Sequence, residues 1–113
     1  MNTLRILCVH TGPGMNKLRQ ALESQGYEVL PAASGGKALD VLTSQQVDGV
    51  VLDFDAKAPG GCSLRTRIGH RRPDLPMLLF NQVEDIERLP LHVFGAYLQQ
   101  PAPPDAILAH LKN

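Results

Sequence analysis

Residues 50–53, Val-Val-Leu-Asp, decide the fold class of this chain. Three apolar residues follow one another with no polar residue between them, and such a run predicts a short strand that is buried on both faces. Strands of this kind lie in the middle of parallel sheets that helices cover on both sides. Asp53 ends the run, so we expect a carboxylate where this strand ends.

Further short apolar runs lie on either side of this strand along the chain. They predict strands at residues 4–9, 29–32, 77–80 and 96–98. The segments between these runs place apolar residues at helical spacing. Strands that alternate with helices in this way form a parallel sheet with right-handed crossovers. We therefore predict an α/β fold of the flavodoxin-like (βα)5 type, an open parallel five-stranded sheet in the order 2-1-3-4-5 with helices on both faces.

Start and stop signals bound the predicted helices. Gly26 is expected to end the first helix in a left-handed conformation, and Ser34 to cap the start of the second. Leu64 and Ile68 share one face of the third helix. A last helix is predicted to start at the Pro-Pro pair of residues 103–104. Its inward-facing residues are expected to be Ile107, Leu108 and Leu111.

The composition disfavours several classes of protein. The 113 residues, of which 43% are hydrophobic, suffice for one core, so we expect a single domain over residues 1–113. The 11 basic residues balance the 11 acidic ones, and no net field favours nucleic acid or a membrane surface. No apolar run approaches the ~18 residues of a membrane span, and the amino-terminal residues lack the pattern of a signal peptide. We expect a cytoplasmic protein.

Six stretches of the sequence are informative together. They are R-I-L-C-V at 5–9, L-E-S-Q-G-Y-E-V at 22–29, A-S-G-G-K-A-L at 33–39, V-D-G-V-V-L-D at 47–53, R-R-P-D-L-P at 71–76 and A-Y-L-Q-Q-P at 96–101. In this order, and over essentially the whole chain, they resemble the receiver domain of two-component response regulators. The resemblance implies a bacterial-type protein of phosphorelay signal transduction.

The resemblance also implies a phosphoacceptor. In that family an Asp ends the third strand, and the spacing from Val47 and Asp48 places Asp53 on this position. The Pro that the family has four residues after the acceptor is Pro59, which lies four residues after Asp55 and six after Asp53. Either this loop carries a two-residue insertion or Asp55 takes the acceptor role.

Other positions of the family's site have changed in this chain. Receivers hold Mg²⁺, an ion that prefers oxygen ligands, with two acidic residues after the first strand, where this chain has His10 and Thr11. The hydroxyl residue that ends strand four is Asn81, and the Lys that precedes a Pro after strand five is Gln100. Phosphoryl transfer depends on positioning and on neutralisation of charge by a metal and a cation. We therefore expect phosphorylation to be lost or weak, the Mg²⁺ site to be lost, and no other cofactor.

The expected role is that of a degenerate receiver without catalytic residues, not an enzyme, that acts through protein–protein contacts. Its partner is expected to be a sensor kinase, a downstream signalling protein or a second copy of the chain. Val83, Ile86 and Leu89 predict a short helix that Pro90 ends, and the region from 83 to 95 as a whole is rich in apolar residues. Leu91 and Phe94, with Tyr97 of the predicted fifth strand, form the expected interaction face.

The residues leave three alternatives open. Asp53 could be the acceptor of an atypical but working receiver. The turn at residues 11–14, Thr-Gly-Pro-Gly, precedes a helix and could cradle the phosphate of a flavin or another small ligand. His10, Asp53 and Asp55 offer ligands of the kind that transition metals accept, whereas the two cysteines lack metal-type spacing. The basic run at 65–72 has no interleaved aromatic residue and is expected to be a solvated helix face, not a nucleic-acid site.

Overall fold

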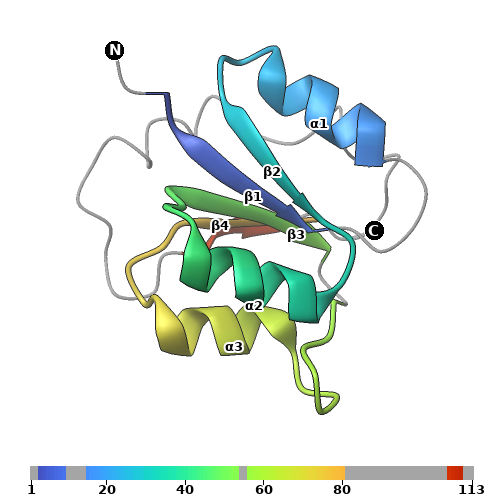
Figure 1. Ribbon diagram of the computed structural model, residues 1–113, viewed down its shortest axis with the longest axis vertical. Coiled ribbons are helices and arrows are strands. Elements are labelled where there is room, and N and C mark those ends of the chain that lie inside the picture. Colours follow the sequence, from blue (N-terminus) through green and yellow to red (C-terminus); the bar gives the residue numbers. More distant parts are fainter. Residues whose placement is uncertain (1–2, 10–14, 54–55, 81–106, 111–113) are drawn as a thin grey trace.

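The computed structural model describes residues 3–9, 15–53, 56–80 and 107–110. Its sheet has the order β2-β1-β3-β4-β5, and every neighbouring pair is parallel. The strands are β1 (Arg5–Val9), β2 (Glu28–Ala32), β3 (Gly49–Asp53), β4 (Met77–Phe80) and β5 (Ile107–His110). The described helices are α1 (Met15–Glu23), α2 (Gly35–Ser44) and α3 (Leu64–Arg71). Figure 1 shows α1 on one face of the sheet and α2 and α3 on the other, so the predicted fold class is confirmed.

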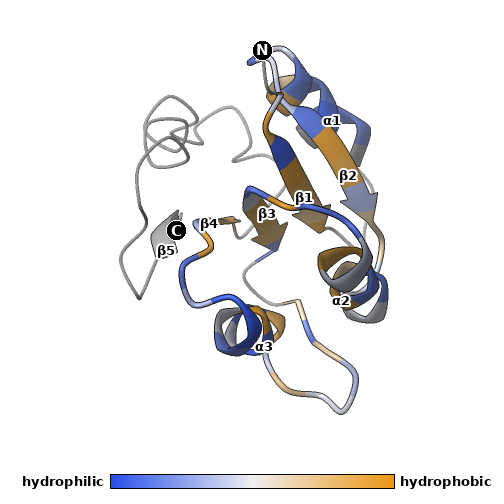
Figure 2. Ribbon diagram, turned by 60° about the vertical axis from the view of Figure 1, so that its left-hand side comes forward, coloured by the Kyte–Doolittle hydropathy of each residue, from blue (hydrophilic) through white to orange (hydrophobic). Residues whose placement is uncertain are grey.

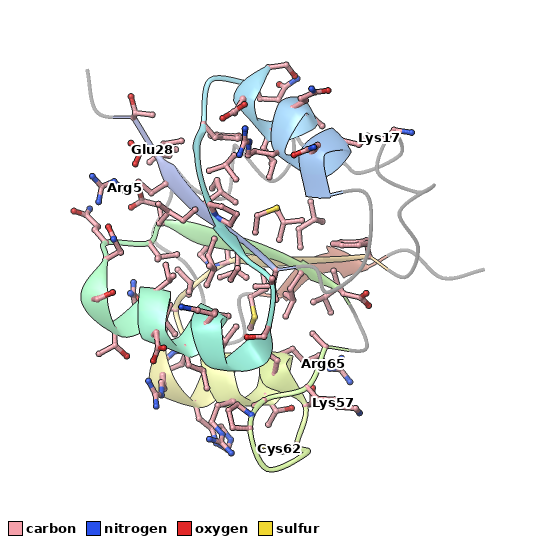
Figure 3. All side chains as sticks on the ribbon, turned by 45° about the vertical axis from the view of Figure 1, so that its right-hand side comes forward. Arg5, Lys17, Glu28, Lys57, Cys62 and Arg65 are labelled. Carbon is pink, nitrogen blue, oxygen red and sulfur yellow. The ribbon has the colours of Figure 1, made fainter. Side chains whose placement is uncertain are left out.

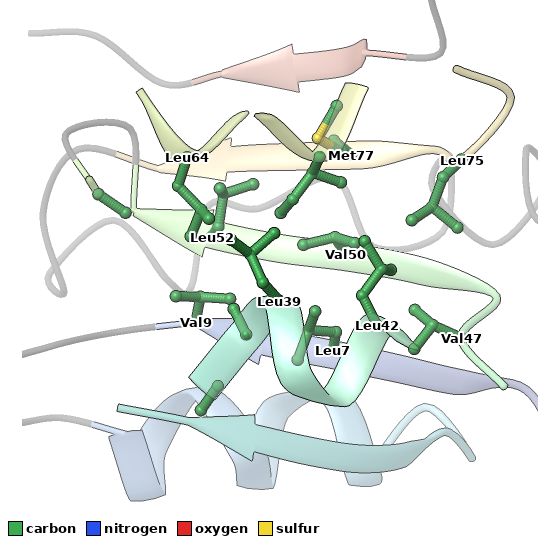
Figure 4. Packing of buried hydrophobic residues seen from close by; sticks show 14 of the residues in the cluster. Leu7, Val9, Leu39, Leu42, Val47, Val50, Leu52, Leu64, Leu75 and Met77 are labelled. Carbon is green, nitrogen blue, oxygen red and sulfur yellow. The ribbon is translucent and has the colours of Figure 1, made fainter. Parts of the chain in front are cut away.

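The core lies in two layers on either side of the central strand. Val50, Val51 and Leu52 of β3 are fully buried, because this strand is flanked by β1 and β4 and covered on both faces. Side chains alternate along a strand, so Val50 and Leu52 face α2 and α3 while Val51 faces the other side. Figure 4 shows the layer beneath α2 and α3, and Figure 2 shows the apolar strands between helices with polar outer surfaces. The main residues of this layer are Leu7, Val9, Leu39, Leu42, Val50, Leu52, Leu64 and Ile68.

The predicted helix signals are confirmed where the structure describes them. Gly26 has a φ of 90°, the left-handed conformation that favours glycine after a helix. The Oγ of Ser34 accepts a hydrogen bond of 3.2 Å from the backbone N–H of Lys37, and so caps α2. Leu64 and Ile68 are fully buried on the inner face of α3. No helix among the described residues is long and apolar enough to cross a membrane.

The strand β2 lies at one edge of the sheet. The N–H of Glu28 donates to the carbonyl of Leu4 over 2.9 Å, so the backbone groups of Glu28 point toward β1. Backbone groups point alternately to the two sides of a parallel strand, and Pro31, three residues later, directs its own toward the open side. A proline has no N–H to offer there, which is why it is accepted in an edge strand.

The prediction for the carboxyl-terminal end of the chain is wrong in its element type. Ile107 and Leu108 were expected on the inner face of a helix, but the structure places them in β5, which pairs with β4. Met77 lies opposite Ile107 and Leu79 opposite His110, with an irregularity between Met77 and Leu78. A short apolar run is compatible with a helix and with a strand. Here a strand forms because it can pair with the backbone groups at the open edge of the buried strand β4. The predicted strand at 96–98, the predicted helix at 83–89 and Leu111 lie outside the described residues.

Candidate functional site

The candidate site is the edge of the sheet at which the parallel strands end. Asp53 is the last residue of β3, and its Cα is paired in register with that of Phe80, the last residue of β4. Val9 ends the neighbouring strand β1, opposite Leu52. Asp53 is half-buried. The structure therefore confirms that a carboxylate stands at the carboxyl end of the central strand, where open α/β sheets bind their ligands.

Other predicted site residues lie outside the residues that the structure describes. Val9 and Phe80 are the described residues that directly precede two of them, so β1 and β4 deliver the chain to this edge immediately before residues 10 and 81. The residues concerned are His10, Thr11, Asp55, Asn81, Leu91, Phe94, Tyr97 and Gln100.

A tight hairpin at residues 56–63 connects the site to α3. Its base is an antiparallel bridge between Lys57 and Ser63. The N–H of Ala58 donates to the carbonyl of Cys62 over 2.7 Å. Gly60 and Gly61 form the tip with φ values of 94° and 87°, which favour glycine. Residues 56–63 are therefore cross-linked by hydrogen bonds of their own backbone.

The hairpin is anchored at both ends. The N–H of Ala56 donates to the carbonyl of Asp53 over 3.0 Å, and the N–H of Leu64 donates to the carbonyl of Ala56 over 2.9 Å. Ala56 and Ala58 are buried against the core layer beneath α2 and α3. The backbone of Asp53 and the first residue of α3 are thus joined through Ala56.

Two cations flank this hairpin. Lys57 is exposed at its base, and Arg65 follows it in the first turn of α3. In Figure 3 the side chains of both extend outward in the same general direction. Arg65 belongs to the basic run at 65–72 that was predicted to be a solvated helix face, and no sequence pattern singled out Lys57. Lys57 and Arg65 come close because Lys57 pairs with Ser63, and this pairing forms only in the folded loop. Both residues nevertheless follow Asp53 in the sequence, which was a usable signal.

The two cysteines lie in different environments. Cys8 is fully buried in β1, and burial raises the pKa of its thiol from 9.0 to about 12. It therefore behaves as a small buried hydrophobe. Cys62 is exposed in the hairpin, and its Sγ accepts a hydrogen bond of 2.8 Å from Nη2 of Arg67. Within the described ranges, no three His, Cys, Asp or Glu side chains are grouped so that they could hold a metal ion.

Comparison with known proteins identifies the relatives of this chain. A search of protein-family models found no match. The chain is 31% identical over 113 residues to the response regulator MprA of Mycolicibacterium vanbaalenii, covering 96% of this chain and 49% of that protein. It is 29% identical over 106 residues to the transcriptional regulatory protein GlrR of Escherichia coli K12, covering 90% of this chain and 24% of that protein. The chain thus spans about half the length of the first relative and a quarter of the second.

Solved structures agree in fold. The signal receiver domain of an HD domain-containing protein from Pseudomonas fluorescens Pf-5 superposes with a TM-score of 0.68 at 22% identity, over 97% of this chain and 82% of that one. The response regulator TrrA of Thermotoga maritima superposes with a TM-score of 0.60 at 30% identity, over 70% of each chain. With the strand order, the position of Asp53 and these identities in agreement, the chain belongs to the family of response regulator receiver domains.

Proposed function

We propose that this receiver domain is degenerate, and that it signals through protein–protein contacts with phosphorylation at Asp53 lost or strongly weakened. The proposal rests on the residues at which strands β1 and β4 end. Because β1 ends at Val9 and β4 at Phe80, His10, Thr11 and Asn81 follow directly the strand ends at which the family places its acidic pair and its hydroxyl residue. None of these three side chains carries the group that the family uses.

The donor set does not fit Mg²⁺. This ion prefers an octahedral shell of carboxylate, water and phosphate oxygens. Of the residues assigned to the site, Asp53 offers one carboxylate, with a second only if Asp55 turns toward it. His10 offers an imidazole nitrogen, which suits transition metals better, and Thr11 offers a neutral hydroxyl. We therefore propose that the site does not bind Mg²⁺ specifically.

Neutralisation of the phosphoryl charge is weakened as well. The family's Lys is replaced by Gln100, and an amide brings no positive charge to an anion. An aspartyl phosphate formed at Asp53 would lack both the metal and this cation, on which phosphoryl transfer depends. The proposal accordingly assigns no enzymatic activity to the chain.

The proposed output is a contact with another protein. Leu91, Phe94 and Tyr97 are the proposed contact residues, because the sequence from 83 to 95 is rich in apolar residues, and exposed apolar groups commonly mark an interaction site. The proposed partner is a sensor kinase, a downstream signalling protein or a second copy of the chain, and the proposed location is the cytoplasm. Contact with nucleic acid or a membrane is not part of this proposal, because the chain has no net charge.

The phosphorylation half of the proposal is tested by mass. The protein is incubated with acetyl phosphate, with and without Mg²⁺, and its intact mass is recorded over time. We expect no species heavier by one phosphoryl group, or only a trace that Mg²⁺ does not increase. Saturable NMR shifts around Asp53 on addition of Mg²⁺ and beryllofluoride, the combination named in the TrrA complex, would also contradict the proposal.

A working acceptor is the second candidate, and the position of Asp53 favours it. The carboxylate is only half-buried at the carboxyl end of β3, so a small phosphodonor can reach it. If the mass increase does occur, Asp53→Asn and Asp55→Asn decide between the two carboxylates. If only one of these variants loses the mass increase, its substituted residue is the acceptor, and the hypothesis of a degenerate receiver is wrong.

The contact half of the proposal needs a separate test. Leu91→Ser with Tyr97→Ala is expected to weaken self-association or capture of a sensor kinase, measured by analytical ultracentrifugation and by pull-down. Asp53→Asn is expected to leave the same association unchanged. The opposite pattern, with association lost in Asp53→Asn alone, would place the contact at the acceptor edge.

A further inference from the structure

Positive charge is concentrated on one part of a chain that is neutral overall. Residues 56–73 contain five Lys and Arg residues and no Asp or Glu. The five are Lys57, Arg65, Arg67, Arg71 and Arg72. They belong to the hairpin at 56–63 and to α3 with its carboxyl-terminal cap, which follow each other without a gap.

Two of these guanidinium groups are held in place by neutral acceptors. Nη2 of Arg67 donates to Sγ of Cys62 over 2.8 Å, and Nη1 of Arg71 donates to Oγ1 of Thr43 over 3.0 Å. Arg67 and Arg71 are four residues apart, so they are neighbours on one side of α3. Since Thr43 belongs to α2, this side runs along the neighbouring helix, which lies next to α3 in Figure 1. We call it the Arg67–Arg71 flank.

The charge of the flank is not neutralised within the described part of the chain. Neither Arg67 nor Arg71 forms an ion pair there, whereas Arg72 lies 3.8 Å from Asp74, and Arg5 lies 3.4 Å from Glu28. A guanidinium has five N–H donors, and the described contacts use one of them at each of the two residues. The remaining N–H groups of Arg67 and Arg71 belong to side chains that these hydrogen bonds already orient. Less conformational entropy is therefore lost when the two side chains bind a ligand.

Helix stability accounts for only part of this arrangement. His70 and Arg71 lie in the last turn of α3, where the helix dipole favours cations. Arg65, however, lies in the first turn, which contains no acidic residue, although the dipole favours anions there. Ser63 at the N-cap makes no side-chain capping bond. Positive charge is therefore kept along the whole helix, at both the favourable end and the unfavourable one, and such local conflicts are typical of binding surfaces.

We propose that the Arg67–Arg71 flank docks an acidic segment of a partner protein, with pairs of carboxylates spaced one helical turn apart. Two guanidinium groups at i and i+4 match two carboxylates at i and i+4 on a partner helix, and the planar fork binds a carboxylate through two parallel hydrogen bonds. The chain has no net charge, and residues 56–73 contain no Phe, Tyr or Trp, so they lack both a long-range attraction to nucleic acid and the large rings best suited to base stacking. Binding at the Arg67–Arg71 flank requires no phosphoryl group, so this proposal stands whether or not Asp53 can be phosphorylated.

The test measures binding of a defined acidic probe. The probe is an acetylated, amidated and fluorescently labelled alanine-based helical peptide with Glu at every fourth position, and the control peptide has Gln in place of Glu. We expect anisotropy to show binding of the Glu peptide, weakened by salt, and none of the Gln peptide. In an NMR titration of the unmodified protein, shifts are expected at α3 and the hairpin, not at α1.

Variants decide whether the flank itself is responsible. Arg67→Gln with Arg71→Gln is expected to weaken binding by at least about tenfold. Arg19→Gln with Lys37→Gln removes the same charge from α1 and α2 and is expected to leave affinity unchanged. Equal losses in both pairs, or no binding of the Glu peptide at all, would overturn the proposal. Tighter Arg67- and Arg71-dependent binding of a short DNA duplex would overturn it in favour of a nucleic-acid surface.

If the double Gln variant does not fold by circular dichroism, Arg67→Lys with Arg71→Lys takes its place. This pair keeps the charge and removes the fork, so we expect affinity to fall while the salt dependence of binding remains. Unchanged affinity in the Lys pair would show that bidentate recognition has no part in binding and would likewise overturn the proposal.

Discussion

The carbonyl oxygen of Lys57 occupies the space in which a β-carbon of Gly35 would stand. The hairpin at 56–63 therefore meets the first residue of α2 through backbone atoms alone. Gly35 is buried, and the contact joins the segment that follows Asp53 to a helix far from it in sequence. Only a residue without a side chain permits this approach.

We predict that Gly35→Ala destabilises the protein by roughly 1–3 kcal/mol, the usual cost of overpacking, because the backbone of Lys57 must move. Gly36→Ala is the matched control in the same helical turn, since its β-carbon would meet Cγ of Pro59 at an ordinary 3.7 Å. This control is expected to be neutral or to gain up to about 1 kcal/mol from helix propensity. Urea unfolding measures both, and equal effects would show that the close approach has no energetic consequence.

The two helix-capping serines are expected to differ. Ser34→Ala removes the bond to the N–H of Lys37 and should cost about 1 kcal/mol in the free energy of unfolding. Ser63→Ala removes a side chain that makes no capping bond and should cost little. The comparison uses the same substitution at the same type of position, and a larger loss at Ser63 would contradict the assignment of the caps.

Stability is predicted to fall at alkaline pH because of Cys8. Burial holds its pKa near 12 in the folded protein, and in the unfolded chain the thiol ionises near its ordinary value of 9.0. Between these values the folded state binds more protons, so the stability that is fully present below pH 9 is lost as pH rises toward 12. We expect a loss of about 1 kcal/mol between pH 8 and pH 10 relative to Cys8→Ala, measured by urea unfolding. Parallel profiles of the two proteins would contradict the prediction.

The two thiols should also differ in reactivity. Cys62 is exposed and Cys8 is fully buried, so a disulfide reagent such as Ellman's reagent is expected to modify one thiol rapidly in the native protein. The second thiol should react only on unfolding in urea. In Cys62→Ser the rapid phase should vanish, and a rapid phase that persists there would mean that β1 opens readily.

Restoring the family's residues in the acceptor site also tests the hypothesis that this receiver is degenerate. The combined substitutions His10→Asp, Thr11→Asp, Asn81→Thr and Gln100→Lys should bring back Mg²⁺ affinity if only the site's side chains have been lost. Isothermal titration calorimetry with Mg²⁺ measures the gain against the unmodified protein. A folded variant that still fails to bind Mg²⁺ would mean that the loop after Asp53 has reshaped the edge.

The sequence predicted most of what local patterns determine. The run at residues 50–53 indicated the buried central strand, and Ser34 and Gly26 indicated helix ends that the structure confirms. Burial on both faces leaves a signal in three or four consecutive residues, and a capping bond spans only three.

Contacts between distant segments were not predictable in the same way. The residues next to Gly35 in the sequence do not indicate that the carbonyl of Lys57 lies against it. The hydrogen bonds from Arg67 to Cys62 and from Arg71 to Thr43 form only in the folded hairpin and between the packed helices. The carboxyl-terminal error has a related cause. Ile107 and its neighbours fit two local structures, and the choice between them is made by the edge of β4. Of the candidate site, the position of Asp53 was predictable because a strand end needs only local information.

The proline in β2 has a consequence for crowded solutions of this protein. An approaching chain that tries to add its own strand along this edge needs a donor every second residue, and at Pro31 it finds none. Polymers that grow by strand-to-strand addition therefore lose one backbone hydrogen bond at this side of the sheet. Pro31→Val would supply the missing donor in a residue type that favours strands, and so make this edge a better template for strand addition.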